Sequence, residues 1–131
     1  MAHVLIVTHG MLAEALLASA KMIIGEEKTR GVDCLDMTEE KSMDQFCQEA
    51  RTILEANPDD NYLIMADVFG ASPCNSCLSV FRNANYRIIT GVNLPMILEL
   101  LMENDNIVLP KLWEGLIESG KKSIMGVYLP A

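Results

Sequence analysis

The chain alternates short apolar runs with longer segments of helical periodicity, and this alternation limits the folds it can adopt more than any other feature. Short runs rich in branched apolar residues are typical of strands buried on both faces of a sheet. Such runs fall at residues 3–8, 31–36, 62–67 and 86–91. Helical patterns follow at residues 11–24, 39–56, 73–81, 95–103 and 110–118, the last of them stopped by Gly120.

Strands that alternate with helices of this length imply right-handed crossovers and a mostly parallel sheet with helices on both faces. We therefore expect an α/β fold. A chain of 131 residues buries one good core, so residues 1–131 are expected to form a single domain. Residues 123–129 alternate less cleanly between apolar and polar positions and are predicted to form a last strand.

The charge and the apolar pattern exclude two classes of partner. A formal net charge of -8 argues against nucleic acid, whose binding depends on clustered Lys and Arg. The apolar segment 11–20 contains Glu14 and is too short to cross a bilayer, and the N-terminus has no basic region followed by a signal-peptide core. We expect a soluble cytoplasmic protein that meets a membrane only indirectly.

The cysteines are irregularly spaced and too few for a secreted disulfide scaffold. Cys74 and Cys77 form a C-x-x-C pair, which raises the question of a redox or zinc site. No second pair and no ligand-like histidine accompanies them, and they follow a helix start. We expect reduced thiols, no metal site and no cofactor.

Chemically versatile residues follow three of the predicted strands. Thr8, His9 and Gly10 come after the first strand, the segment 67–73 after the third, and the segment 90–93 after the fourth. In open α/β sheets, ligands bind outside the carboxyl ends of the strands. These three loops are therefore expected to converge on one site.

His9 is the candidate reactive residue of this site. Its place in a turn after a buried strand, beside Gly10, is expected to leave the imidazole partly exposed. A histidine so placed can act as a nucleophile, a base or a ligand. His3 lies at the opposite end of the same strand and is expected to be an exposed residue without a role.

Asp67 ends an apolar run, where a carboxylate needs a partner. A neighbouring imidazole N–H would supply one. A carboxylate bound to Nδ1–H fixes the ring's tautomer, leaves the Nε2 lone pair free, and stabilises the cation that forms when Nε2 attacks an electrophile. The alternative is that Asp67 only caps the following loop.

The segment Gly70-Ala71-Ser72-Pro73 resembles a helix start, with Ser72 at the N-cap and Pro73 at the first helical position. Free N–H groups and the helix dipole at such a start suit an anion, and Gly70 lets the backbone come close to it. A capped helix without a ligand is the plainer interpretation. With a nucleophilic imidazole and an orienting acid, however, this anion cradle completes what a transient phosphohistidine requires.

Other functional classes lack necessary parts. A P-loop, a Rossmann glycine motif and the G-x-S-x-G motif of serine hydrolases are absent. A receiver domain needs an acidic pair after its first strand, where this chain has Thr8 and His9. A flavodoxin-like binder of flavin or another small molecule stays open, although the aromatic residues that would sandwich a flavin are scarce.

Three stretches carry a family resemblance: "VTHG" at 7–10, "ADVFGASPCN" at 66–75 and "GVNLPM" at 91–96. In this order and spacing they resemble the IIA component of the mannose, fructose and sorbose class of the bacterial sugar phosphotransferase system (PTS). The similarity runs over the whole chain, including "LLASAKMIIGE" at 16–26.

The resemblance implies a cytoplasmic phosphoryl carrier. Its His9 accepts a phosphoryl group on Nε2 from the small histidine-containing carrier protein and passes it to a IIB component, expected on a separate polypeptide. By the same resemblance, Asp67 orients the ring, and Gly70, Ala71 and Ser72 receive the phosphate. Ala71 stands where glycine is commoner in the family.

The resemblance also implies a parallel α/β fold and a homodimer that exchanges its C-terminal strand, residues 123–129. Thr8, Gly10 and Asn93 are expected to border the site, and Asn93 is expected to hold the turn before Pro95. Cys74 replaces a common aromatic residue there. Met11, Leu12, Phe69 and Met96 are expected to flank the rim as a docking surface. The phosphoryl-donor subunit of a dihydroxyacetone kinase looks similar around the histidine and is the alternative function.

Overall fold

The structure is a computed structural model that describes residues 2–29 and 31–130. Strands and helices alternate along it as the sequence predicts. The elements are β1 (His3–His9), α1 (Leu12–Ile24), the short 3₁₀ helix η1 (Glu26–Thr29), β2 (Val32–Met37), α2 (Met43–Ala56), β3 (Asn61–Ala66), α3 (Ser72–Phe81), β4 (Asn85–Thr90), α4 (Leu94–Met102) and α5 (Leu109–Lys122).

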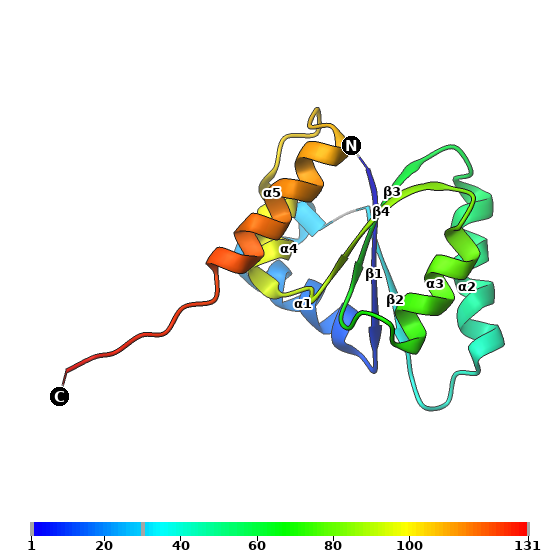
Figure 1. Cartoon of the computed structure of the whole chain (residues 1–131), viewed down its shortest axis with the longest axis horizontal. Coiled ribbons are helices and arrows are strands. Elements are labelled where there is room, and N and C mark those ends of the chain that lie inside the picture. Colours follow the sequence, from blue (N-terminus) through cyan, green and yellow to red (C-terminus); the bar gives the residue numbers. More distant parts are fainter. Residues whose placement is uncertain (1, 30, 131) are drawn as a thin grey trace.

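The four strands form one parallel sheet in the order β2-β1-β3-β4. Helices α1, α4 and α5 cover one face, and α2 and α3 cover the other (Figure 1). The predicted α/β fold is therefore confirmed. From β1 the chain crosses to β2 on one side and then returns to β3 on the other, so the switch point of the sheet lies between β1 and β3.

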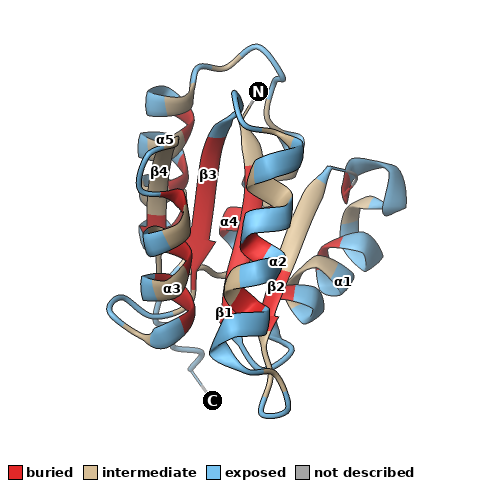
Figure 2. Cartoon of the chain, turned by 90° about the vertical axis from the view of Figure 1, so that its right-hand side faces the viewer, coloured by how far each residue is buried: buried red, intermediate tan, exposed pale blue. Residues whose placement is uncertain are grey.

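The core lies on both faces of the two central strands. Val4 and Ile6 of β1 pack under α1, α4 and α5, whereas Leu5 and Val7 pack under α2 and α3. The buried residues of β1 and β3 accordingly lie between two helical layers (Figure 2). Alternate side chains point to opposite faces, which is why these strands appear in the sequence as continuous apolar runs.

Several predicted element boundaries differ from the structure. Thr8 and His9, expected in a turn, are the last residues of β1. Helix α2 begins at Met43 rather than at residue 39, because Ser42 and Gln45 form a capping box just before it. Gly120 does not stop α5 but lies buried inside it, where a Cβ atom would collide with the Met96 side chain.

The same contact corrects a second expectation, since Met96 belongs to the core and does not flank the rim. The predicted last strand is also wrong for the single chain. Residues 124–130 form no regular secondary structure and extend away from the body (Figure 1). A strand needs a neighbouring strand to pair with, and this segment lies beside none in its own sheet. Exchange between two copies stays a prediction.

Candidate active site

His9 is the last residue of β1 and lies beside the switch point of the sheet. Its side chain is 51% exposed. Residues 4–8 before it are buried, so side-chain exposure begins where the strand ends. The imidazole therefore stands on an open rim that a large partner can reach.

Asp67 follows β3 and holds His9 from the neighbouring strand. Its Oδ2 lies 2.8 Å from Nδ1 of His9 and accepts the main-chain N–H of the same residue at 3.0 Å. Its Oδ1 accepts the N–H of Val68 at 2.9 Å. The carboxylate thus binds the imidazole and also caps the following loop, so both sequence interpretations of Asp67 describe part of its contacts.

The charge state of Asp67 fixes the tautomer of the ring. Burial by itself would raise the pKa of Asp67, but the hydrogen bonds from the His9 main chain, the His9 ring and the Val68 N–H outweigh it and hold this pKa below its usual value. An ionised carboxylate can only accept, so Nδ1 of His9 carries the proton. In the neutral ring the lone pair is therefore on Nε2, and no group in residues 2–29 or 31–130 hydrogen-bonds this nitrogen.

Thr8 and Gly10 fix the backbone on either side of His9. The hydroxyl of the fully buried Thr8 accepts the N–H of Ala13 at 2.8 Å and so ties the start of α1 to β1. Gly10 adopts φ 57°, a left-handed conformation that favours glycine, and its N–H donates to the carbonyl of Met37 at 2.9 Å. These two residues hold the backbone turn and so fix the position from which the His9 side chain extends.

The loop between β3 and α3 contains the predicted anion cradle. Gly70 has φ 77°, and the structure places Ala71 at the N-cap and Ser72 at the first helical position, so the helix begins one residue earlier than predicted. The difference arises because Ala71 already has extended backbone angles and its carbonyl accepts the first helical hydrogen bond, from Asn75. The first-turn N–H groups remain directed out of the helix.

Asn75 was not singled out from the sequence, although it ends the stretch 66–75. Its side-chain amide donates to the carbonyl of Gly70 at 2.9 Å. An asparagine inside a helix pattern carries no sequence signal for such a contact, because the acceptor is set by the loop conformation.

The loop after β4 lies against the same site. Gly91 and Val92 donate their N–H groups to the carbonyls of Asp67 and Ala66, both at 3.0 Å. Asn93 is the N-cap of α4, where its Oδ1 accepts the N–H of Met96 at 3.0 Å. The third predicted loop is thus brought to the rim through the backbone of Asp67.

The expectation for His3 is wrong, because its side chain is only 15% exposed. Its Nε2 lies 2.6 Å from Asp33 and its Nδ1 lies 3.1 Å from Asp60, and the ring stacks on Tyr62. Burial by itself lowers the pKa of His3, but the two carboxylates outweigh it and raise the pKa above its usual value. The sequence could not show this because both acids come from other elements.

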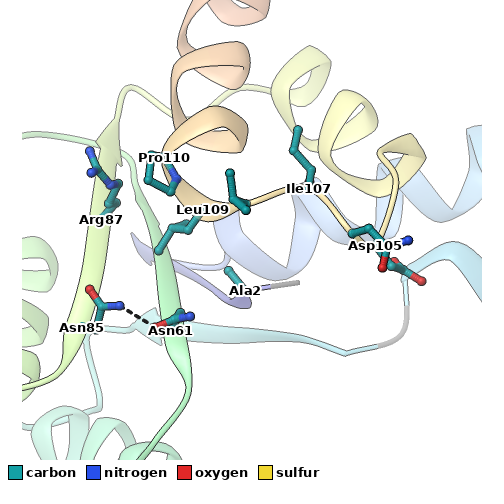
Figure 3. A pocket seen from close by; sticks show the side chains of 10 residues that line it. Ala2, Asn61, Asn85, Arg87, Asp105, Ile107, Leu109 and Pro110 are labelled. Atoms are coloured by element: carbon teal, nitrogen blue, oxygen red, sulfur yellow. Dashed lines mark hydrogen bonds between the residues drawn. The ribbon is translucent and has the colours of Figure 1, made fainter.

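A hollow of about 500 Å³ lies at the opposite end of the sheet (Figure 3). Asn61 and Asn85 begin neighbouring strands there and bond each other. Arg87 also lines it, with its guanidinium 5.0 Å from the ring centre of Trp113. None of the residues predicted for the active site lines this hollow.

Residues 2–29 and 31–130 contain neither a cluster of metal-ligating side chains nor a helix that could span a membrane. No group of three or more His, Cys, Asp or Glu side chains is arranged to hold a metal ion. No helix there is long and apolar enough to cross a membrane.

Cys74 and Cys77 are free and buried, and burial raises the pKa of the Cys77 thiol to about 12, which keeps it in the unreactive thiol form.

The fold and the site together define the class of this protein: a parallel α/β protein with a carboxylate-held histidine at the switch point of its sheet. The family model described as "PTS system fructose IIA component" matches residues 3–116. The chain therefore belongs to this family of phosphotransferase-system IIA components, and the resemblance seen in the three sequence stretches is confirmed.

Individual relatives agree with the family. The chain is 31% identical over 105 residues to the mannose-specific EIIAB component of Escherichia coli K12, which covers 79% of this chain and 32% of that protein. It is 27% identical over 125 residues to the fructose-specific EIIA component of Bacillus subtilis, and this match covers 94% of this chain and 84% of that protein. The chain thus spans about a third of the length of the first of these relatives.

A solved structure gives the same result. The mannose/sorbose specific IIA subunit of Enterococcus faecalis matches with a TM-score of 0.87 and 26% identity, over 99% of this chain and 97% of that one. The protein is therefore a IIA component of the mannose, sorbose and fructose type, and such components belong to a phosphotransferase system.

Proposed function

We propose that this chain is a cytoplasmic phosphoryl carrier of a sugar phosphotransferase system. His9 accepts a phosphoryl group from the histidine-containing carrier protein and passes it to a IIB component. The observation that carries the proposal is the contact between Nδ1 of His9 and Asp67, because it leaves the lone pair of Nε2 free at an exposed rim. A carrier that must meet two protein partners in turn needs such an exposed nucleophile.

The proposed step is an in-line displacement. Nε2 attacks phosphorus, an N–P bond to His9 forms, and the N–P bond of the donor histidine breaks with its electron pair returning to the donor nitrogen. The imidazole becomes cationic as the bond forms, and the carboxylate of Asp67 offsets that charge through Nδ1–H. Transfer to the IIB component runs the same step in reverse.

We assign the phosphate-receiving role to Gly70, Ala71 and Ser72. The phosphoryl group brings up to two negative charges. First-turn N–H groups of α3 and the positive end of its dipole offset negative charge, and Gly70 has no side chain to obstruct the approach. Thr8, Gly10 and Asn93 border the site by holding the backbone around it.

Exposed apolar side chains near His9 supply the docking surface in this proposal. Met11 and Leu12 follow His9 closely in the chain, and Val68 and Phe69 follow Asp67; Phe69 is 78% exposed. Large apolar side chains on a rim are typical of protein contacts. Because methionine adapts its shape, this surface suits two successive partners.

We further propose that residues 1–131 act as one domain and that two copies form a homodimer by exchanging residues 123–129. Ile124, Met125, Val127, Tyr128 and Leu129 are exposed in the single chain, and β4 is an edge strand. Sedimentation of the full chain and of a chain ending at Lys122 tests this: the full chain is expected to be a dimer and the shorter one a monomer, and a monomeric full chain refutes the exchange.

The carrier function is tested by mixing the purified chain with radiolabelled phosphorylated carrier protein and following the label. Label is expected on the wild-type chain, and adding the IIB component is expected to discharge it. His9→Gln keeps a polar side chain of similar size and is expected to take no label. Equal labelling of His9→Gln and wild type would refute the assignment of His9.

A further inference from the structure

The loop that precedes α3 is held by hydrogen bonds rather than by packing. The side chains of Val68 and Phe69 at its tip are exposed, so they bury little apolar surface that could fix the loop. Its first half is anchored through Asp67, whose carbonyl accepts the N–H of Gly91 and whose carboxylate accepts those of His9 and Val68. These bonds leave the second half, Gly70 and Ala71, to be held by other groups.

Asn75 holds that second half with two different groups. Its side-chain amide donates to the Gly70 carbonyl at 2.9 Å, and its main-chain N–H donates to the Ala71 carbonyl at 2.9 Å. Two consecutive carbonyls are therefore directed toward one residue of α3. Among the described residues, Asn75 provides the side-chain hydrogen bond that ties Gly70 to the helix.

The direction of these carbonyls fixes the direction of two N–H groups. The peptide unit is planar and trans, so its C=O and N–H point in opposite directions. The unit that joins Gly70 to Ala71 turns its carbonyl toward Asn75 and therefore points the Ala71 N–H away from it. In the next peptide unit, the Ala71 carbonyl accepts the main-chain N–H of Asn75, so the N–H of Ser72 also points away from Asn75.

We propose that Asn75 is a positioning residue whose side-chain amide aims the N–H group of Ala71 at the phosphoryl group carried by His9. This inference rests on the function proposed above. Asn75 itself does not touch the reacting atoms and acts through the Gly70 carbonyl. Without its amide, the peptide after Gly70 is free to rotate, since glycine restricts its own backbone least of all residues.

Asn75 is exposed, so losing its side-chain bond is expected to change stability little. The effect on phosphoryl transfer is expected to be larger, because misaimed N–H donors no longer offset the charge of the phosphoryl group. Loss of one aligned donor in comparable anion-binding sites slows catalysis by about 100-fold, and a donor that is only misaligned is expected to cost about 10-fold.

The test uses phosphoramidate as donor, which removes partner docking from the measurement. Nε2 of His9 attacks its phosphorus, and the P–N bond of phosphoramidate breaks with release of ammonia. Asn75→Ala is expected to phosphorylate about 10-fold more slowly than wild type, with an unchanged melting temperature. Asn75→Asp is expected to be slower still, because a carboxylate cannot donate to Gly70 and adds negative charge. Ser79→Ala, an exposed change on the same helix, is the matched control and is expected to behave as wild type.

Amide proton shifts distinguish positioning from a general structural effect. In the wild-type chain, phosphorylation is expected to move the amide proton signals of Ala71 and Ser72. In Asn75→Ala the movement of Ala71 is expected to shrink and that of Ser72 to be kept, because the main-chain N–H of residue 75 still bonds the Ala71 carbonyl. A normal rate in Asn75→Ala, or normal amide shifts despite a slow rate, would overturn the inference. A wild-type chain that takes no phosphoryl group at all would instead refute the proposed function.

Discussion

The Oδ2 atom of Asp67 lies 2.8 Å from Nδ1 of His9 and 3.0 Å from the main-chain nitrogen of the same residue. One carboxylate oxygen therefore holds both the ring of His9 and the end of the strand that carries it. Because β1 and β3 are adjacent and parallel, their carboxyl ends bring these two residues together although they are 58 positions apart in the sequence.

Asp67→Asn tests the charge of this contact while keeping its shape. The amide has no negative charge to offset the imidazolium, so the rate of phosphorylation of His9 is expected to fall by about 100-fold, within the range for charge stabilisation in enzymes. Circular dichroism is expected to show the same fold. Stopped-flow measurement of label uptake gives the rate, and a rate within twofold of wild type would show that the charge of Asp67 is not used.

His3 is expected to make the free energy of unfolding depend on pH. Its pKa is raised above 6.5 in the folded chain, so its contribution to stability is complete below pH 6.5 and is lost as pH rises through the raised pKa. His3→Gln is expected to remove this slope and to cost about 0.5 kcal/mol at pH 6, the size of a partly exposed ion pair. Urea unfolding followed by Trp113 fluorescence at several pH values measures it. An unchanged slope in His3→Gln contradicts the account.

Asp36 is expected to destabilise the folded chain at neutral pH. It is 6% exposed, and its Oδ1 finds no donor among the described residues while the carboxyl faces Glu14; Lys41 donates only to its main-chain carbonyl. Burial first, and then the charge of Glu14, raise the pKa of Asp36 above 3.8, so stability present below pH 3.8 is lost as pH rises through the raised pKa.

Asp36→Asn is therefore expected to raise the free energy of unfolding at pH 7 by about 1 kcal/mol, because an amide can donate to Glu14 and carries no charge to bury. The exposed Glu39→Gln is the control and is expected to change it little. Urea titrations at pH 7 compare the three chains. A less stable Asp36→Asn chain would mean that the charged form is the favoured one.

Alanine substitutions at two glycines of α5 are expected to change stability in opposite directions. A Cβ atom at Gly120 would collide with the terminal methyl of Met96, so this flexible side chain must shift within the core and Gly120→Ala is expected to cost about 1 kcal/mol, the low end for overpacking. Nothing lies near a Cβ atom at Gly115, so Gly115→Ala is expected to stabilise the helix by about 0.5–1 kcal/mol. Thermal unfolding of both variants checks this, and a stabilised Gly120→Ala chain would show that α4 and α5 are not packed so closely.

The sequence predicts the sheet and the reacting pair because local patterns determine both. The apolar runs of β1 and β3 mark strands buried on both faces, and the parallel topology then brings the residues that follow them, His9 and Asp67, to one rim. The contact between the two side chains also depends on β3 lying next to β1, which these patterns do not specify.

The remaining features depend on contacts between distant elements and could not be predicted. His3 lies between two acids from other parts of the chain. At Gly120 there is little room for a side chain because Met96 of another helix lies against it. The amide of Asn75 finds the Gly70 carbonyl only once the loop has taken its left-handed turn. Residues 124–130 have strand-like character but no partner strand among the residues that the structure describes.

The most direct test of the central claim is the position of phosphorus on the imidazole of His9. After phosphorylation of the ¹⁵N-labelled chain, phosphorus–nitrogen coupling in NMR spectra identifies the bonded ring nitrogen. Because Asp67 holds Nδ1–H, the expected signal is a bond to Nε2 of His9. Phosphorus on Nδ1, on another residue, or on none would contradict the account.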